Sequence, residues 1–195
     1  QGLAASAGIA DLDARRISLL RVPEIHRDPL VVQMQQALPL VKDRAFNQGP
    51  VVNAKAEKTI LEYIEKGRQE GRLVAGGAKA PGDGYFIQPT VIADIQPGAV
   101  IEQEEIFGPV LAVIPYASDD EAITLANDSQ FGLAGTVWST DDERATEVAR
   151  AVHTGTIGVN DYQLDFRAPF GGVKASGIGR ELGPEGLEAF FALKS

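Results

Sequence analysis

The sequence predicts an α/β fold in which a mostly parallel sheet is flanked by helices. Strand-like apolar runs alternate with helix-like segments along the chain, which is the pattern of layered α/β proteins. Residues 110–116 (VLAVIPY) are almost continuously apolar, as expected of a strand covered on both faces. Two segments in the second half also carry strong helix-start signals.

The first half of the chain contains one clear helix, at residues 53–70. Apolar side chains recur on one of its faces, with Glu and Lys opposite, and Gly67 and Gly71 mark its end. The other segments expected here are a buried strand at 15–22, a helix at 28–42, a turn at 45–50, a strand at 72–77, an exposed loop at 78–84 and an extended segment at 85–95.

The second half contains two helix starts with the capping-box pattern. Ser118 is followed by Glu121, and Thr140 by Glu143, so each hydroxyl is expected at the N-cap and each carboxylate at N3. Strands are expected at 135–139 and 156–160. We find no interior linker and expect residues 1–195 to form a single domain.

Charge and hydropathy exclude several classes of partner. The 195 residues carry a net charge of −9 and a sequence pI of about 4.7, which disfavours binding to a nucleic-acid backbone. No apolar stretch is long enough to span a bilayer, and the opening residues lack the basic segment of a signal peptide. We therefore expect no membrane association, and a cytoplasmic location by default.

Cysteine and histidine usage limits the possible chemistry. The sequence has no cysteine, which excludes disulfides, thiolate metal sites and a thiol nucleophile among these residues. Its two histidines, His26 and His153, lie far apart without a neighbouring ligand pattern, so we expect no metal site.

Three segments go beyond a generic α/β pattern: EEIFGPV (104–110), NDSQFGLAGTVWS (127–139) and PFGGVKASGIGRELG (169–183). In this order and spacing they resemble the C-terminal part of the catalytic domain of an aldehyde dehydrogenase. The resemblance covers about residues 50–195, while residues 1–49 look diverged. The helix at 53–70 resembles the pyrroline-carboxylate dehydrogenase branch of that family.

The resemblance implies roles for five residues. Glu105 matches a glutamate that accepts hydrogen bonds from the nicotinamide ribose, and Phe107 matches an aromatic that faces the nicotinamide ring. Asn160 and Asp161 match positions that end a strand near the substrate pocket, and Phe170 matches an aromatic wall of the aldehyde tunnel. As single residues, Phe107 and Phe170 are more often core than ligand contacts, and without the IFGP motif the Glu pair would suggest only a solvated surface.

The chemistry implied by the resemblance is incomplete in this chain. The family uses a thiolate nucleophile, a glutamate base and a dinucleotide-binding domain, and the residues before the 15–22 strand (GIADLDA, 8–14) contain no cysteine. We expect the cofactor, NAD or NADP, to bind weakly or not at all, and we expect no oxidation of a small aldehyde by this chain alone.

Two other functions stay open. The segment AASAG (4–8) loosely resembles a nucleophile turn with Ser6 as the nucleophile. With His26 or His153 as the base, the chain would be an ester hydrolase. Alternatively, it is a non-catalytic module that associates with copies of itself. An unpaired sheet edge and a partly built interface near residues 192–195 favour a homo-oligomer.

Overall fold

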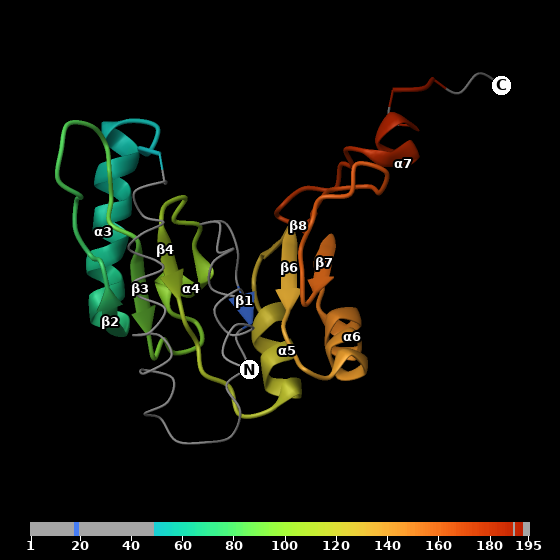
Figure 1. Cartoon of the computed structure of the whole chain (residues 1–195), viewed down its shortest axis with the longest axis horizontal. Coiled ribbons are helices and arrows are strands. Elements are labelled where there is room, and N and C mark those ends of the chain that lie inside the picture. The colour runs from blue at the N-terminus through green and yellow to red at the C-terminus, as the bar shows by residue number, and fades with distance from the viewer. Residues whose placement is uncertain (1–17, 20–48, 189, 193–195) are drawn as a thin grey trace. The chain divides into compact units, whose positions relative to one another are not determined.

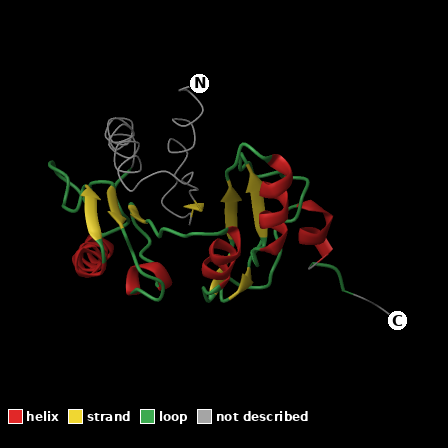
Figure 2. Cartoon of the chain, turned by 90° about the horizontal axis from the view of Figure 1, so that it is seen from below, coloured by secondary structure: helices red, strands yellow, loops and turns green. Residues whose placement is uncertain are grey.

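The computed structural model describes residues 18–19, 49–188 and 190–192 (Figure 1). The chain divides into two compact units, with described residues 49–115 in unit 1 and residues 18–19 and 116–192 in unit 2. Strands lie beside helices in both units, as expected of an α/β fold (Figure 2). That the two units together make one catalytic-type domain stays a prediction.

Unit 1 is built from α3 and a three-stranded sheet. Its elements are α3 (Ala54–Glu70), β2 (Arg72–Ala75), β3 (Thr90–Ala93), α4 (Val100–Gln103) and β4 (Val110–Ala112). The sheet order is β2-β3-β4, with β2 antiparallel and β4 parallel to β3. Ile60 and Ile64 of α3 are buried, which confirms the apolar face expected from the sequence.

Helix α3 begins as the sequence predicts. The Asn53 side chain accepts a hydrogen bond of 2.9 Å from the Ala56 backbone N–H, which satisfies one of the unpaired donors of the first turn. At the other end, the Gly71 N–H donates to the Gly67 carbonyl oxygen at 2.9 Å. The expected helix at 53–70 is therefore confirmed, with Asn53 as its cap.

Unit 2 contains a parallel sheet and a small antiparallel pair. Its elements are β1 (Ser18–Leu19), α5 (Asp119–Asn127), β5 (Phe131–Gly132), β6 (Ala134–Val137), α6 (Asp142–Ala151), β7 (Thr156–Val159), β8 (Val173–Lys174) and α7 (Gly183–Glu188). Strands β1, β6 and β7 lie in that order and all pair in parallel, while β5 pairs antiparallel with β8. Parallel pairings therefore predominate among the described strands, as expected.

Two expectations need correction. The second capped helix begins one residue later than predicted, because the Asp141 carboxylate, rather than the Thr140 hydroxyl, accepts the Arg144 N–H at 3.0 Å. The strand expected at 110–116 covers only Val110–Ala112, and all three residues are half-buried rather than fully covered. Strand β4 is an edge strand of the described sheet and pairs only with β3.

Parts of the chain that carried predictions lie outside the described residues. They include the helix expected at 28–42 and most of the strand expected at 15–22, of which the described residues Ser18 and Leu19 are extended. Among the described helices, none combines the length and apolarity that crossing a membrane requires.

Candidate functional site

The EEIFGP segment (104–109) forms the turn between α4 and β4 in unit 1. Glu104 ends α4 in an extended conformation, with φ −103° and ψ 145°. Phe107 has φ 57°, in the left-handed region that residues other than glycine rarely adopt, and 65% of its surface is exposed. The turn therefore presents an aromatic side chain on a strained backbone, and such strain persists only where the surrounding structure enforces it.

The two glutamates of the turn have different environments. The Glu104 carboxylate accepts a hydrogen bond of 2.5 Å from the Tyr63 hydroxyl on α3. Within the described part of the chain, no hydrogen bond or ion pair engages the Glu105 carboxylate, which is exposed. The pair is thus divided into one structural acceptor and one acceptor that is available to hydroxyl donors.

The contact between Tyr63 and Glu104 also changes the acidity of the phenol. The hydrogen bond to Glu104 raises the pKa of Tyr63, and partial burial and the negative charge of Glu104 raise it further. Tyr63 therefore stays a hydrogen-bond donor through neutral pH and into the alkaline range.

Asn160 and Asp161 follow β7 in unit 2. Asn160 has φ 56°, and its side-chain amide is engaged at both ends: Oδ1 accepts the Ser139 N–H at 2.8 Å and Nδ2 donates to Asp142 Oδ1 at 2.7 Å. Asp161 is exposed and accepts its neighbour's backbone N–H at 2.7 Å. In this structure Asn160 ties the end of β7 to the start of α6, and its expected contact with substrate stays a prediction.

The PFGGVKASG loop is bonded to the NDSQFGL segment. Strand β8 pairs with β5, and the Ser176 hydroxyl oxygen accepts the Gly132 N–H at 3.0 Å. The Lys174 ammonium donates to the carbonyl oxygens of Asn127 and Ser129, each at 2.9 Å. Two of the three segments that carried the resemblance therefore form one structure, although they lie about forty residues apart in sequence.

Phe170 lies at the start of this loop and is half-buried. Its backbone N–H and carbonyl exchange hydrogen bonds of 2.7 Å with Glu181, which closes the loop. The Arg180 guanidinium donates to the Gly172 carbonyl oxygen at 2.7 Å, which connects the two ends of the loop a second time. The loop thus holds the Phe170 side chain on a backbone that is fixed at both ends.

Comparison with known proteins decides the family. Residues 23–195 match the sequence profile described as the aldehyde dehydrogenase family. The chain belongs to the aldehyde dehydrogenase family. The profile match reaches further toward the N-terminus than the segments at 50–195 that carried the resemblance.

Individual aldehyde dehydrogenases agree with this assignment. The chain is 53% identical over 154 residues to a geranial dehydrogenase of Castellaniella defragrans, which covers 78% of the chain and 32% of that protein. It is 44% identical over 155 residues to a mitochondrial aldehyde dehydrogenase of Sus scrofa, and this match covers 78% of the chain and 30% of that protein. The crystal structure of a Mycobacterium tuberculosis aldehyde dehydrogenase complexed with NAD+ superimposes with a TM-score of 0.74 at 43% identity, covering 82% of this chain and 36% of that one. The chain spans about a third of the length of these relatives.

The residues predicted for an ester hydrolase are only partly described. Ser6 and His26 lie outside the described residues. His153 is exposed and follows the C-terminal end of α6, where its backbone N–H donates to Asn127 Oδ1 at 2.7 Å. The described residues also contain no cluster of acidic and histidine side chains that could hold a metal ion.

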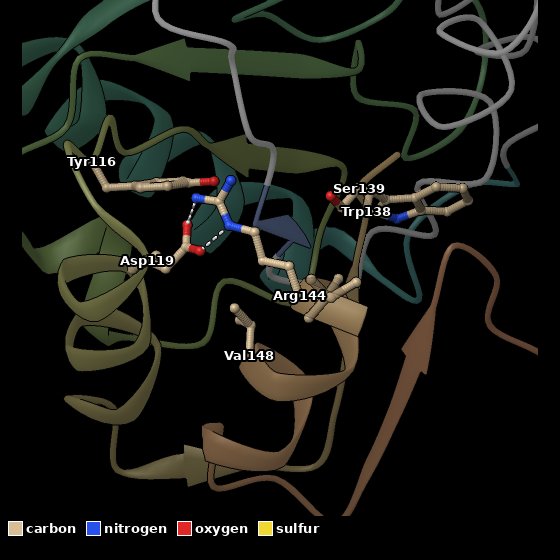
Figure 3. A pocket seen from close by; sticks show the side chains of 9 residues that line it. Tyr116, Asp119, Trp138, Ser139, Arg144 and Val148 are labelled. Atoms are coloured by element: carbon tan, nitrogen blue, oxygen red, sulfur yellow. Dashed lines mark hydrogen bonds and ion pairs between the residues drawn. The ribbon is translucent and has the colours of Figure 1, made fainter. Parts of the chain in front are cut away.

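A shallow pocket in unit 2 was not expected from the sequence. It lies between the starts of α5 and α6 and is open to solvent (Figure 3). Asp119 and Arg144 form a bidentate ion pair beside it, with one N–O distance of 2.6 Å, and this contact raises the pKa of Arg144. Its lining residues are Tyr116, Asp119, Ala122, Val137, Trp138, Ser139, Arg144, Ala145 and Val148. The only signal in the sequence was the pair of acidic helix starts, which does not identify the arginine.

Proposed function

We propose that these residues form the C-terminal part of the catalytic unit of an NAD(P)-dependent oxidoreductase that acts on aldehydes. The observation that carries this proposal is the turn at 104–109, where the unengaged Glu105 carboxylate lies two residues from the exposed Phe107 ring. Membership of the aldehyde dehydrogenase family supports it, because a relative with the same fold is complexed with NAD+.

The residues of the turn fit a nicotinamide nucleotide. Glu105 is an acceptor-only side chain, which suits the two hydroxyl groups of a ribose. Phe107 offers an apolar face to a flat ring. When bound, the cofactor supplies hydride acceptance, and these two side chains bind and orient its nicotinamide end. One carboxylate and one ring give few contacts, so we propose that NAD or NADP binds weakly or not at all to this chain alone.

We further propose that this chain alone does not oxidise aldehydes. Covalent catalysis in this family requires a thiolate, and the 195 residues contain no cysteine. Asn160, Asp161 and Phe170 in unit 2 then contribute contacts to the substrate rather than the reacting nucleophile. A thiolate would have to come from residues outside this sequence or from another chain.

Titration with nicotinamide mononucleotide, followed by ligand-observed NMR, tests the role of the turn. We expect binding in the millimolar range or weaker, reduced roughly tenfold in Glu105→Ala because two charge-assisted hydrogen bonds are lost. Glu147→Ala is the control, because it removes another exposed carboxylate, on α6. Binding that is equally strong in the wild type and in Glu105→Ala would contradict the proposal.

An ester assay separates the alternative function. We expect no hydrolysis of activated esters that depends on Ser6. Hydrolysis that is present in the wild type and lost in Ser6→Ala would select the ester hydrolase and remove the need for a dehydrogenase role.

We also propose that the chain forms a homo-oligomer. Unit 2 exposes several large apolar side chains, each more than half accessible: Phe166, Ile178, Leu187, Phe190 and Phe191. Exposed apolar surface of this kind is typical of interaction sites. Light scattering of the purified chain should give a mass above 20.7 kDa, and a monomer at every concentration would contradict this part of the proposal.

A further inference from the structure

Helix α3 contacts the segment that carries Glu105 and Phe107 at successive positions along one face. At its C-terminal end, the Glu70 carboxylate accepts the N–H groups of Val100 and Ile101 at 2.9 and 3.1 Å, which caps α4. In the middle of the helix, Tyr63 donates to Glu104. Nearer its N-terminal end, Ile60 packs so closely on Gly108 that a Cβ there would lie 2.6 Å from the Ile60 Cδ1 atom. The part of α3 from Ile60 to Glu70 and the segment from Val100 to Gly108 therefore run antiparallel and are in contact at these three positions.

The aromatic ring of Tyr63 is fixed independently of its hydroxyl. The ring packs against the buried cluster of Ile92, Ile95 and Ile101. On its face, the Lys66 ammonium lies 4.6 Å from the ring centroid, within the range of a cation–π contact. Packing therefore holds the ring, and the hydroxyl carries the hydrogen bond to Glu104 of the turn.

We propose that Tyr63 is a positioning residue, whose hydroxyl holds Glu104 so that Glu105 and Phe107 face away from α3 toward a nicotinamide nucleotide. The orientation toward the cofactor rests on the function proposed above, whereas the restraint of the turn by Tyr63 does not. The two contacts bracket the strained residue, since Glu104 is bonded to Tyr63 on one side of Phe107 and Gly108 packs on Ile60 on the other. A phenylalanine with a positive φ persists only where surrounding contacts of this kind hold its backbone.

Cleavage by a glutamyl endopeptidase tests the restraint. Tyr63→Phe keeps the packed ring and removes only the donor, and Tyr85→Phe is the matched control because that side chain is 40% exposed and its hydroxyl has no bonded partner among the described residues. We expect cleavage after Glu105 to become about fivefold faster in Tyr63→Phe, as the loss of about 1 kcal/mol of local restraint predicts. The control should cleave at the wild-type rate.

Cleavage elsewhere in unit 1 separates positioning from general stability. The exposed glutamate Glu65 lies on the same helix, and cleavage after it should stay within about twofold of the wild type. If cleavage after Glu65 rises in parallel with cleavage after Glu105, Tyr63 merely stabilises the unit and the proposal is overturned. Equal rates after Glu105 in Tyr63→Phe and Tyr85→Phe would overturn it as well.

Substitutions of the acceptor provide a second, independent series. Glu104→Ala should loosen the turn as much as Tyr63→Phe, and the double variant should add nothing further, because both changes remove the same bond. Glu104→Gln keeps an oxygen acceptor and should restore most of the protection. Additive effects of the two single changes would contradict the proposal.

The ligand measurement is kept separate from the cleavage measurement. If Tyr63→Phe loosens the turn but nicotinamide mononucleotide does not bind the wild type at the highest concentration that can be reached, the restraint stands and the cofactor role fails. If the nucleotide binds and Tyr63→Phe weakens it as much as Glu105→Ala does, both stand. Binding that is unchanged in Tyr63→Phe, although the turn is loosened, would remove the positioning role.

Discussion

Gly108→Ala tests whether the EEIFGP turn (104–109) packs against α3. A Cβ at Gly108 would lie 2.6, 2.7 and 2.8 Å from the Cδ1, Cγ1 and Cγ2 atoms of Ile60. Carbon atoms in contact normally stay roughly 3.5–4.0 Å apart, so three contacts would each be about 1 Å too short. Ile60 is only 1% exposed and therefore has little free space into which it can move.

The expected cost follows from this overlap. Inserting a methyl group into a packed core costs about 1–3 kcal/mol, and three simultaneous overlaps place Gly108→Ala in the upper part of that range. Reduced freedom of the unfolded chain recovers about 0.4–1 kcal/mol of the loss. We therefore expect the free energy of unfolding to fall by about 2 kcal/mol.

Urea unfolding followed by far-ultraviolet circular dichroism measures this loss. A double-mutant cycle identifies the contact: Ile60→Ala alone should cost about 2–5 kcal/mol, and the double variant should cost at least 1 kcal/mol less than the sum of the single changes. Gly179→Ala is the control, because no atom lies within 4 Å of its added Cβ. If Gly108→Ala is as mild as Gly179→Ala, or if the two changes simply add, the turn is not seated on α3 as described.

Three further predictions concern separate parts of the chain. Gly155→Ala should destabilise unit 2 by roughly 3 kcal/mol or more, because its Cβ would lie 1.7 Å from the carbonyl oxygen of Gly171; Gly135→Ala, whose nearest contact is 3.8 Å, should change urea unfolding by less than about 1 kcal/mol. Asn53→Ala should cost about 1 kcal/mol by removing the cap of α3, and an unchanged unfolding midpoint would refute the capping role. The folded-state pKa of Tyr63 is raised, so the stability that its hydroxyl contributes is present in full below about pH 10 and is lost as the pH rises through the raised value. The difference in unfolding free energy between the wild type and Tyr63→Phe should accordingly stay constant below about pH 10 and shrink as the pH rises above it, and a difference that grows would contradict this sign.

Local patterns predicted the elements that depend on near neighbours. The helix at 53–70 was predictable because its apolar face repeats at spacings of three or four residues, whereas its Asn53 cap is known from the structure. The second capped helix was placed one residue early, because Thr140 and Asp141 are both good caps and only the backbone geometry selects Asp141. Strand β4 was predicted too long, because an apolar run does not reveal where its pairing with β3 ends.

Contacts between distant residues were beyond the sequence. The expected contact of Asn160 with substrate stays a prediction, but the hydrogen bonds of its amide to Ser139 and Asp142, 21 and 18 residues away, could not be predicted from the sequence. The ion pair between Asp119 and Arg144 likewise joins residues 25 positions apart. The difference between Glu104 and Glu105 was only partly predictable: alternation along an extended backbone separates the two side chains, but the choice of Glu104 depends on Tyr63, 41 residues earlier.

The central claim is that this chain presents a cofactor-facing turn without the nucleophile needed for turnover. The most direct test mixes the purified chain with NAD+ and a small aldehyde and follows the formation of NADH by its fluorescence. The predicted result is no NADH formation above the blank without protein, in the wild type and in Glu105→Ala alike. NADH formation that depends on the protein and is lost in Glu105→Ala would contradict the claim, and would require a nucleophile other than cysteine within these 195 residues.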